Sequence, residues 1–141
     1  MGGVLLDANV LIALAWPEHE SHERAGRWFG RHSRAGWATC PFTQSALVRV
    51  LSNPAFSSHS LTPQNALAVL ETNLKLPGHR FWPADISISQ AASLVGHPLT
   101  GHRQITGMYL LGLAIHNRGR LATLDRALKE IDPGNAVDCI P

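Results

Sequence analysis

Residues 3–7, GVLLD, and residues 120–125, RLATLD, decide the fold that the sequence predicts. Each is a short apolar run that ends in an aspartate. A run that is apolar on both faces is typical of a strand buried in a parallel sheet. Ligands of such sheets bind beyond the carboxyl ends of the strands. We therefore expect Asp7 and Asp125 to meet at one edge of a sheet, although they lie at opposite ends of the chain.

Short apolar strands and helical patterns alternate along the rest of the chain. Further strands are expected at 37–40, 79–82 and 136–140. The helices expected between the strands lie at 8–16, 18–33, 44–52, 63–76, 87–95, 103–117 and 125–131. Thr43 is the expected N-cap of the third helix and Thr62 of the fourth. The alternation predicts an α/β/α sandwich around a central, mainly parallel sheet, in a single domain that spans residues 1–141 without a linker or repeat.

The composition is that of a folded protein with a sizeable core. Of the 141 residues, 45% are hydrophobic and 16% charged, which excludes disorder as the main state. The net charge of +2 is too small to indicate a nucleic-acid surface by itself. The two cysteines, Cys40 and Cys139, show neither a CxxC pattern nor a zinc-ligand spacing, and we expect a reducing compartment.

The first sixteen residues are apolar enough to be mistaken for a signal peptide. They lack a basic start and carry Asp7 inside the apolar run, so we do not expect a signal peptide. No other segment approaches the roughly 20 apolar residues that a membrane span requires. We therefore predict a cytoplasmic protein without a membrane contact.

Two aspartates at strand ends have two interpretations. Aspartate is among the best helix N-caps, and each residue is followed by a predicted helix. Alternatively, the pair binds a divalent cation, because Mg²⁺ and Mn²⁺ prefer hard oxygen ligands and are often held by one or two carboxylates together with substrate phosphates. Hydrolysis of a phosphodiester is the chemistry that such a site favours.

Three segments together resemble a known family. They are LLDANVLIAL at 5–14, CPFTQSALVRVLSNP at 40–54 and QITGMYLLGLAIHNRGRLATLDRAL at 104–128. In this order and at these distances they resemble the PIN-domain ribonucleases, and within them the VapC toxins of bacterial type II toxin–antitoxin pairs. The resemblance implies an endoribonuclease in which acidic residues bind Mg²⁺ or Mn²⁺ and a metal-activated water attacks an RNA phosphodiester.

The resemblance also implies a role for several residues. The first and the late aspartate of the family match Asp7 and Asp125, which would be the metal ligands. Asn9 matches a polar position that supports the first acid, and Thr123 a hydroxyl position before the late acid. Gln44 stands where many members have a glutamate, and its amide oxygen is expected to orient a metal-bound water.

Gly107 is the gravest departure from the family pattern. The segment TGMYLLGLA has this glycine where the family usually places a metal-binding aspartate. Three explanations stay open: a naturally degenerate toxin, a substitution selected or engineered because the active nuclease is toxic to its host, or a metal held by two aspartates and water alone. Loss of a carboxylate should weaken Mg²⁺ binding, so we predict low or absent activity. The alternative function is that of a catalytically dead PIN-domain protein that binds an antitoxin in a regulatory complex.

Arginines are the expected contacts for RNA. Arg24, Arg27, Arg31 and Arg34 recur at spacings of three and four and share one side of a helix. Such a row is most often a solvated face; as a functional prediction, Arg27 and Arg31 bind RNA phosphates. Arg49 lies in the segment that matches the family's second motif and is the third expected RNA contact, although a structural ion pair would equally explain it.

The resemblance further implies the partners. An antitoxin would wrap the protein and occupy its acidic crevice, and operator DNA would be bound only through the antitoxin. RNA would be the substrate, and a homodimer is expected.

Overall fold

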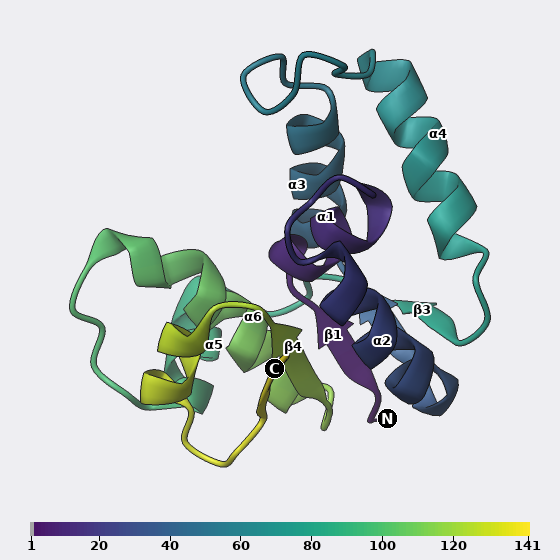
Figure 1. The fold of residues 1–141 in the computed structure, drawn as a ribbon. Coiled ribbons are helices and arrows are strands. Elements are labelled where there is room, and N and C mark those ends of the chain that lie inside the picture. The colour runs from purple at the N-terminus through teal and green to yellow at the C-terminus, as the bar shows by residue number, and fades with distance from the viewer. Residues whose placement is uncertain (1) are drawn as a thin grey trace.

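The computed structural model describes residues 2–141; residue 1, which belongs to the predicted domain 1–141, lies outside the described residues. Within this range five strands form one sheet in the order β3-β2-β1-β4-β5, and all four pairings are parallel (Figure 1). The strands are β1 (Val4–Leu6), β2 (Trp37–Thr39), β3 (His79–Phe81), β4 (Arg120–Thr123) and β5 (Val137–Cys139). The five predicted strands are therefore confirmed.

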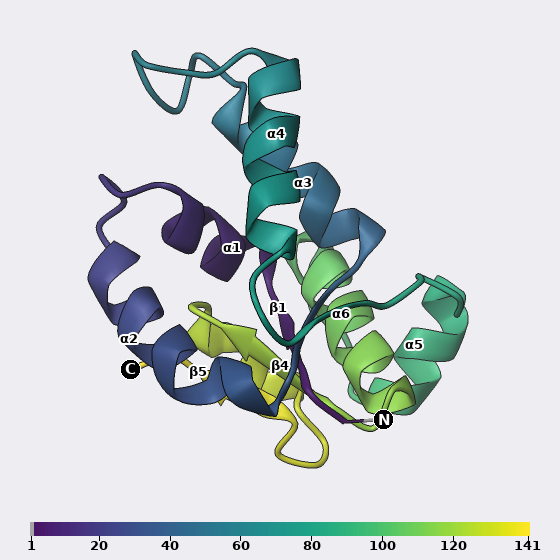
Figure 2. The same ribbon diagram turned by 90° about the vertical axis from the view of Figure 1, so that its right-hand side faces the viewer.

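Helices cover both faces of this sheet. The α-helices are α1 (Ala8–Ala15), α2 (His22–His32), α3 (Pro41–Leu51), α4 (Pro63–Leu74), α5 (Ile88–Val95) and α6 (Ile105–His116). Short 3₁₀ helices are η1 (Ser33–Ala35), η2 (His102–Gln104) and η3 (Arg126–Ile131). Figure 2 shows α2 and α5 on opposite sides of the strands. The predicted α/β/α sandwich is thus confirmed.

The two faces of the sheet form separate cores because side chains alternate along each strand. Leu5 and Leu121 point to the face that α5 and α6 cover. Val4, Leu6 and Ala122 point to the other face, where α1 to α4 supply the partners. Burial of both faces explains why β1 is continuously apolar, whereas the edge strand β3 is largely exposed and contains His79 and Arg80.

Helix α6 is the most deeply buried helix. Seven consecutive residues, from Met108 to Ala114, are buried, as its nearly uniform apolar sequence predicts. A Cβ at Gly112 would lie 2.6 Å from the Cβ of Ala91, so the glycine permits α5 and α6 to approach closely. Helix α6, β1 and β4 therefore form a closely packed unit, and the residues at the N-terminal end of α6 are positioned by it.

The order of the strands reverses between β1 and β4. The chain steps outward from β1 to β2 and β3, and then crosses to β4 and β5 on the other side. Open parallel sheets bind ligands at such a reversal, outside the carboxyl ends of the strands. Asp7 directly follows β1, and Asp125 comes two residues after the end of β4.

The predicted start of α3 was wrong. The N-cap is Cys40, and Thr43 is the third residue of the helix, where its hydroxyl accepts a hydrogen bond from the backbone N–H of Cys40 at 3.1 Å. The physical reason is Pro41, which has no N–H to donate and a fixed φ suited to the first helical position. Thr62 was assigned correctly, since its hydroxyl accepts from the N–H of Asn65 at 3.1 Å.

Two further helix predictions need correction. The helix expected over 18–33 begins only at His22, because the residues before it form turns in which the N–H of Ser21 donates to Nδ1 of His19. The helix expected over 125–131 is a 3₁₀ helix, confined between its cap Asp125 and the turn at Pro133. In residues 2–141 no helix is long and apolar enough to cross a membrane.

Candidate active site

Asp7 lies at the carboxyl end of β1 and caps α1. Its Oδ1 accepts a hydrogen bond from the N–H of Ala8 at 2.7 Å, and its Oδ2 accepts from the hydroxyl of Thr123 at 2.8 Å. The backbone N–H of Asp7 donates to the carbonyl of Ala122 at 2.9 Å. These bonds fix the carboxylate against β4, which lies 116 residues away in the sequence at Thr123.

The hydroxyl of Thr123 is the hub of this network. Besides donating to Asp7, it accepts from Nδ2 of Asn9 at 3.2 Å and from the N–H of Asp125 at 3.0 Å. Asn9 completes the link, because its Oδ1 accepts from the N–H of Leu124 at 3.1 Å. Three hydrogen bonds saturate the hydroxyl. The structure thus brings together four of the residues that the sequence singled out.

Asp125 caps η3 and faces solvent. Its Oδ1 accepts from the N–H of Ala127 at 3.0 Å, while its Oδ2 has no hydrogen-bond partner among the described residues. Both aspartates therefore act as helix caps, which was the first of the two interpretations of the sequence. Capping uses one oxygen of each carboxylate, so it leaves the second interpretation open.

The two carboxylates repel each other. Burial raises the pKa of Asp7 above its ordinary value of 3.8, and the charge of Asp125 raises the pKa further. The hydrogen bonds from Thr123 and Ala8 oppose this shift but do not cancel it. A bound cation would relieve both the burial penalty and the repulsion.

A cavity of about 490 Å³ opens beside the carboxylates. It is lined by Asp7, Ala8, Asn9, Arg103, Gln104, Thr106, Gly107, Asp125, Ala127, Leu128 and Ile131. Its walls come from the ends of β1 and β4, the N-terminal end of α6, and η3. Arg103 is the one lining residue with a positive charge. The sequence placed it at the start of the helix expected over 103–117, but it lies in η2, and no motif marked it as a site residue.

Gly107 lines this cavity, but the space for a side chain there is already filled. A Cβ at this position would lie 2.5 Å from Cδ2 of Leu128, whose side chain is 5% exposed. The obstructing atom is the end of a flexible side chain, so a larger residue at 107 requires Leu128 to move. In this chain an apolar side chain takes the place where the family resemblance puts an aspartate.

Gln44 does not line the cavity. Its Nε2 donates to the hydroxyl of Thr39 at 2.9 Å, and that hydroxyl lies 2.8 Å from Nε2 of His79. Thr39 is fully buried, and burial lowers the pKa of His79. The side chain of Gln44 is therefore anchored at the carboxyl ends of β2 and β3.

The three arginines predicted to bind RNA also lie outside the cavity. Arg49 is exposed on α3. Arg27 and Arg31 line a different hollow, between α2 and β5. No residue is shared between that hollow and the cavity of the aspartates.

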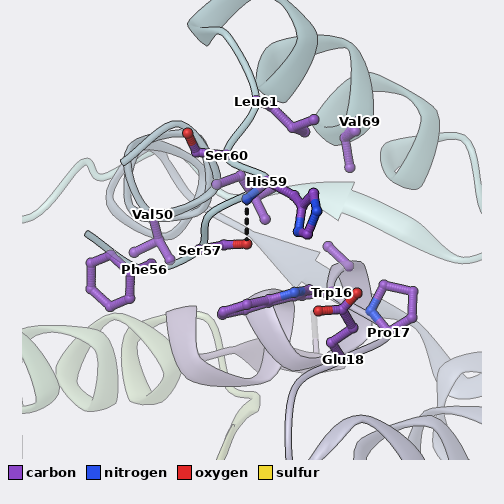
Figure 3. Close-up of a pocket in the computed structure, with 12 residues that line it drawn as sticks. Trp16, Pro17, Glu18, Val50, Phe56, Ser57, His59, Ser60, Leu61 and Val69 are labelled. Carbon is purple, nitrogen blue, oxygen red and sulfur yellow. Dashed lines mark hydrogen bonds between the residues drawn. The ribbon is translucent and has the colours of Figure 1, made fainter. Parts of the chain in front are cut away.

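An apolar cavity of about 240 Å³ lies between the ends of α1 and α3 and the start of α4. Trp16, Phe56 and His59 surround it, and the N–H of His59 donates to the hydroxyl of Ser57 at 3.0 Å (Figure 3). Glu18 is its only carboxylate. This cavity therefore lacks the paired acids that the hydrolytic chemistry requires.

The oxygen donors beside the cavity of the two aspartates suit a hard divalent cation. Asp7 and Asp125 supply carboxylate oxygens, and Asn9 and Thr123 hold them in place. Among residues 2–141, however, no three histidine, cysteine or acidic side chains converge. Mg²⁺ is often bound by one or two carboxylates when waters and substrate phosphates complete its shell. The residues fit such an ion, with a sparse ligand set.

The fold and the two aspartates at its strand reversal define a class of protein. A model of the PIN domain matches residues 4–133. The chain therefore belongs to the PIN-domain family.

Its relatives within that family are VapC ribonucleases. Ribonuclease VapC39 of Mycobacterium tuberculosis is 40% identical over 136 residues, which cover 96% of this chain and 98% of the relative. Ribonuclease VapC29 of the same organism is 40% identical over 134 residues, with 95% and 94% covered.

Two solved structures share the fold. The structure of VapBC2 from Rickettsia felis, bound to a DNA fragment from their promoter, matches with a TM-score of 0.70 and 12% identity over 98% of each chain. DNA-bound VapBC from Salmonella typhimurium matches with a TM-score of 0.62 and 18% identity over the whole of each chain. At these identities the likeness concerns the fold alone.

Proposed function

We propose that this protein is a VapC-type endoribonuclease toxin that hydrolyses RNA phosphodiester bonds with Mg²⁺ or Mn²⁺. The observation that carries the proposal is the pair of carboxylates, Asp7 and Asp125, at the strand reversal beside an open cavity. Relatives named as ribonucleases that are 40% identical over nearly the whole chain support the reaction class.

In this proposal Asp7 and Asp125 hold the metal ion, and the other site residues hold the aspartates. Thr123 and Asn9 lock the two strand ends together, so the carboxylates need no rearrangement when a cation binds. Such preorganisation is a main source of catalytic power. The metal, when bound, lowers the pKa of a coordinated water and neutralises charge on the phosphate.

The remaining cavity residues bind the substrate strand. The guanidinium of Arg103 is suited to a phosphate oxygen, since it can donate two parallel hydrogen bonds. Because Nε2 of Gln44 donates to Thr39, its amide oxygen is the atom left to orient a metal-bound water, as the family resemblance implies. The apolar wall of Leu128 and Ile131 excludes water from one side of the cavity.

Gly107 makes this chain a weak nuclease in our proposal. A site with two carboxylates binds Mg²⁺ less tightly than a site with more acids, because ligand charge and number set the affinity. The position of Leu128 explains how the fold accommodates the glycine.

The test compares RNA cleavage by the unaltered chain, Asp7→Asn, Gly107→Asp and Gly107→Asp/Leu128→Ala, with Mg²⁺ and with Mn²⁺. We expect little cleavage by the unaltered chain and none by Asp7→Asn. The double variant should cleave best, because the introduced carboxylate then has room. Glu71→Gln, an exposed acid on α4, is the control for loss of one charge.

Metal binding gives a second readout that is independent of turnover. Titration of Mn²⁺ should show binding to the unaltered chain, weaker binding to Asp7→Asn and unchanged binding to Glu71→Gln. Equal Mn²⁺ affinity in the unaltered chain and Asp7→Asn, together with cleavage that does not depend on Asp7, would contradict the proposal that Asp7 binds the metal. Mn²⁺ binding without cleavage by any variant would favour the alternative, a catalytically dead protein that binds an antitoxin.

We further propose an antitoxin partner, since both solved neighbours are VapBC assemblies bound to DNA. In this proposal the partner occupies the acidic cavity, operator DNA is contacted only by the partner, and the toxin forms a homodimer. The apolar cavity around Trp16 has the size and lining to receive an apolar side chain of the partner. Co-expression with a candidate VapB-type antitoxin, followed by measurement of the mass of the purified complex, tests the partner and the dimer together.

A further inference from the structure

Helix α2 and strand β5 enclose a hollow of about 550 Å³, which we call the α2 groove. It is lined by Arg24, Arg27, Trp28, Arg31, His32, Asp138, Cys139 and Pro141. The end of the chain lies beside α2 in Figure 2. The three arginines follow one another along the helix at spacings of three and four residues, so they form one row.

No arginine of the row forms an ion pair within residues 2–141, although Asp138 lines the same groove. Within residues 2–141 the single ion pair joins His116 and Asp85 at 3.6 Å, far along the chain from α2. Asp138, the acid in the groove, instead accepts a hydrogen bond from Nε1 of Trp28 at 3.2 Å. Arg24 donates to the hydroxyl of Ser21 at 2.9 Å, which leaves its charge without a counterion.

An aromatic surface lies within the same row. The ring of His32 stacks on the buried Trp28, with centroids 4.7 Å apart and planes 16° from parallel. Nδ1 of His32 lies 2.8 Å from the carbonyl oxygen of Trp28, so the ring is held in this orientation. His32 is itself exposed, and its outer face is therefore a flat surface fixed in place beside Arg31.

The groove begins next to the proposed active site. Arg24 donates to the carbonyl of Ile140 at 3.5 Å, which places the start of α2 beside the carboxyl end of β5. Cys139 of β5 is paired in register with Thr123 of β4, the residue whose hydroxyl holds Asp7. Neighbouring strands lie about 4.8 Å apart. A chain that passes over the carboxyl end of β5 can therefore reach both sites.

We propose that the α2 groove is a second binding site for the RNA substrate, which holds the single-stranded segment beside the phosphodiester to be cleaved. The arginines bind phosphates, and His32 stacks on a base. Arg24 to Arg31 spans about 10 Å of helix, enough for about three nucleotides of a stacked strand. An acidic peptide would satisfy the arginines but would leave the flat face of His32 unused, so single-stranded RNA fits better.

The inference rests on the proposed ribonuclease function, and binding without metal separates the two. Affinity of the chain for a 12-residue oligouridylate is measured in EDTA at several salt concentrations, with Arg27→Ala/Arg31→Ala as the test variant. The slope of log K against log salt is negative, and loss of two phosphate contacts should make it shallower by about 1.4. Lys75→Ala/Arg80→Ala removes two exposed charges elsewhere and should leave the slope unchanged.

Stacking is tested separately at His32. His32→Ala should weaken binding by about fivefold or more without changing the salt slope, and His32→Phe should restore it, because a planar ring suffices. In cleavage assays with Mn²⁺, Arg27→Ala/Arg31→Ala should raise KM for the 12-residue substrate and leave kcat unchanged. A two-residue substrate, too short to reach the groove, should show no change in KM.

Equal oligouridylate affinity and salt slope in the unaltered chain and Arg27→Ala/Arg31→Ala would overturn the inference. The inference would also be overturned if Arg27→Ala/Arg31→Ala weakened binding of a 12-residue oligoglutamate but not of RNA. That result would favour an acidic protein partner. If the groove binds RNA but no variant cleaves it, the proposed nuclease function fails while the groove stands as an RNA site.

Discussion

Asp7 caps a helix although its surroundings disfavour the charged form of its carboxyl group. It caps α1 and accepts the hydroxyl of Thr123, yet its pKa is raised by burial and by Asp125. The folded chain therefore holds the proton of this carboxyl more tightly than the unfolded chain does. The free energy of unfolding should consequently fall as the pH rises from about 3.8, the ordinary pKa, through the raised pKa of the folded state.

This predicts that Asp7→Asn is more resistant to urea than the unaltered chain at pH 7. Asparagine has no charge to bury, and the gain should shrink below the ordinary pKa, where Asp7 is protonated in both states. Urea unfolding at pH 7 and pH 3.5 measures both effects. A variant that is less stable at pH 7 would mean that the two hydrogen bonds outweigh the burial of charge.

Gly107 and Leu128 should be coupled energetically. Gly107→Ala gains about 1 kcal/mol of helix propensity but places a Cβ 2.5 Å from Cδ2 of Leu128. Leu128→Ala alone should lower the free energy of unfolding by about 2–5 kcal/mol. In the double variant the clash is absent, so we expect a favourable coupling of about 1 kcal/mol or more in a double-mutant cycle. Additive effects would show that Leu128 moves aside freely.

Four residues of the site could be predicted from the sequence, whereas the packing around Gly107 could not. Asp7, Asn9, Thr123 and Asp125 are found from strand ends and a family resemblance, because chain direction alone brings strand ends together. The packing of Leu128 over Gly107 could not be found this way, since the direction of a side chain depends on neighbours that the sequence does not place.

At the scale of elements, one hydroxyl joins β2, β3 and α3. Thr39 is fully buried and links Gln44 to His79. Thr39→Val keeps the shape but leaves both partners without their hydrogen bond, which should lower the free energy of unfolding by about 1–3 kcal/mol. Urea unfolding tests this prediction. Thr72→Val, which removes a solvent-exposed bond to Ala68 on α4, should change stability by less than about 0.5 kcal/mol.

The elements were predictable where apolar periodicity is strong and less so at their ends. Helix α6 and strand β1 follow from long apolar runs, whereas β3 (HRF) and β5 (VDC) contain polar residues. The start of α3 was placed too late, because Thr43 is a good cap by type while Pro41 sets the actual first turn. The start of α2 was placed too early, because acidic residues that favour a helix start instead lie in the turns before it.

Across the whole molecule, burial is distributed unevenly. Helix α6 has seven buried residues, whereas α4 has two, Ala66 and Leu70. Figure 1 shows α4 and part of α3 extending away from the sheet. We predict that backbone amides of α4 exchange with deuterium at least tenfold faster than those of α6, because fewer buried contacts resist local opening. Equal protection of the two helices would show that the molecule opens only as a unit.

The bond between Asp7 and Thr123 has a consequence for synthesis of the protein. Asp7 leaves the ribosome before Thr123, the residue that orients it, because Thr123 lies 116 residues further along the chain, and the second aspartate follows Thr123. A nascent chain that has not reached Asp125 therefore carries neither the carboxylate pair nor the assembled cavity. Contacts so distant in sequence form late in folding. A host cell that makes this protein meets the assembled site only after synthesis has passed Asp125, which gives a newly made partner time to be present first.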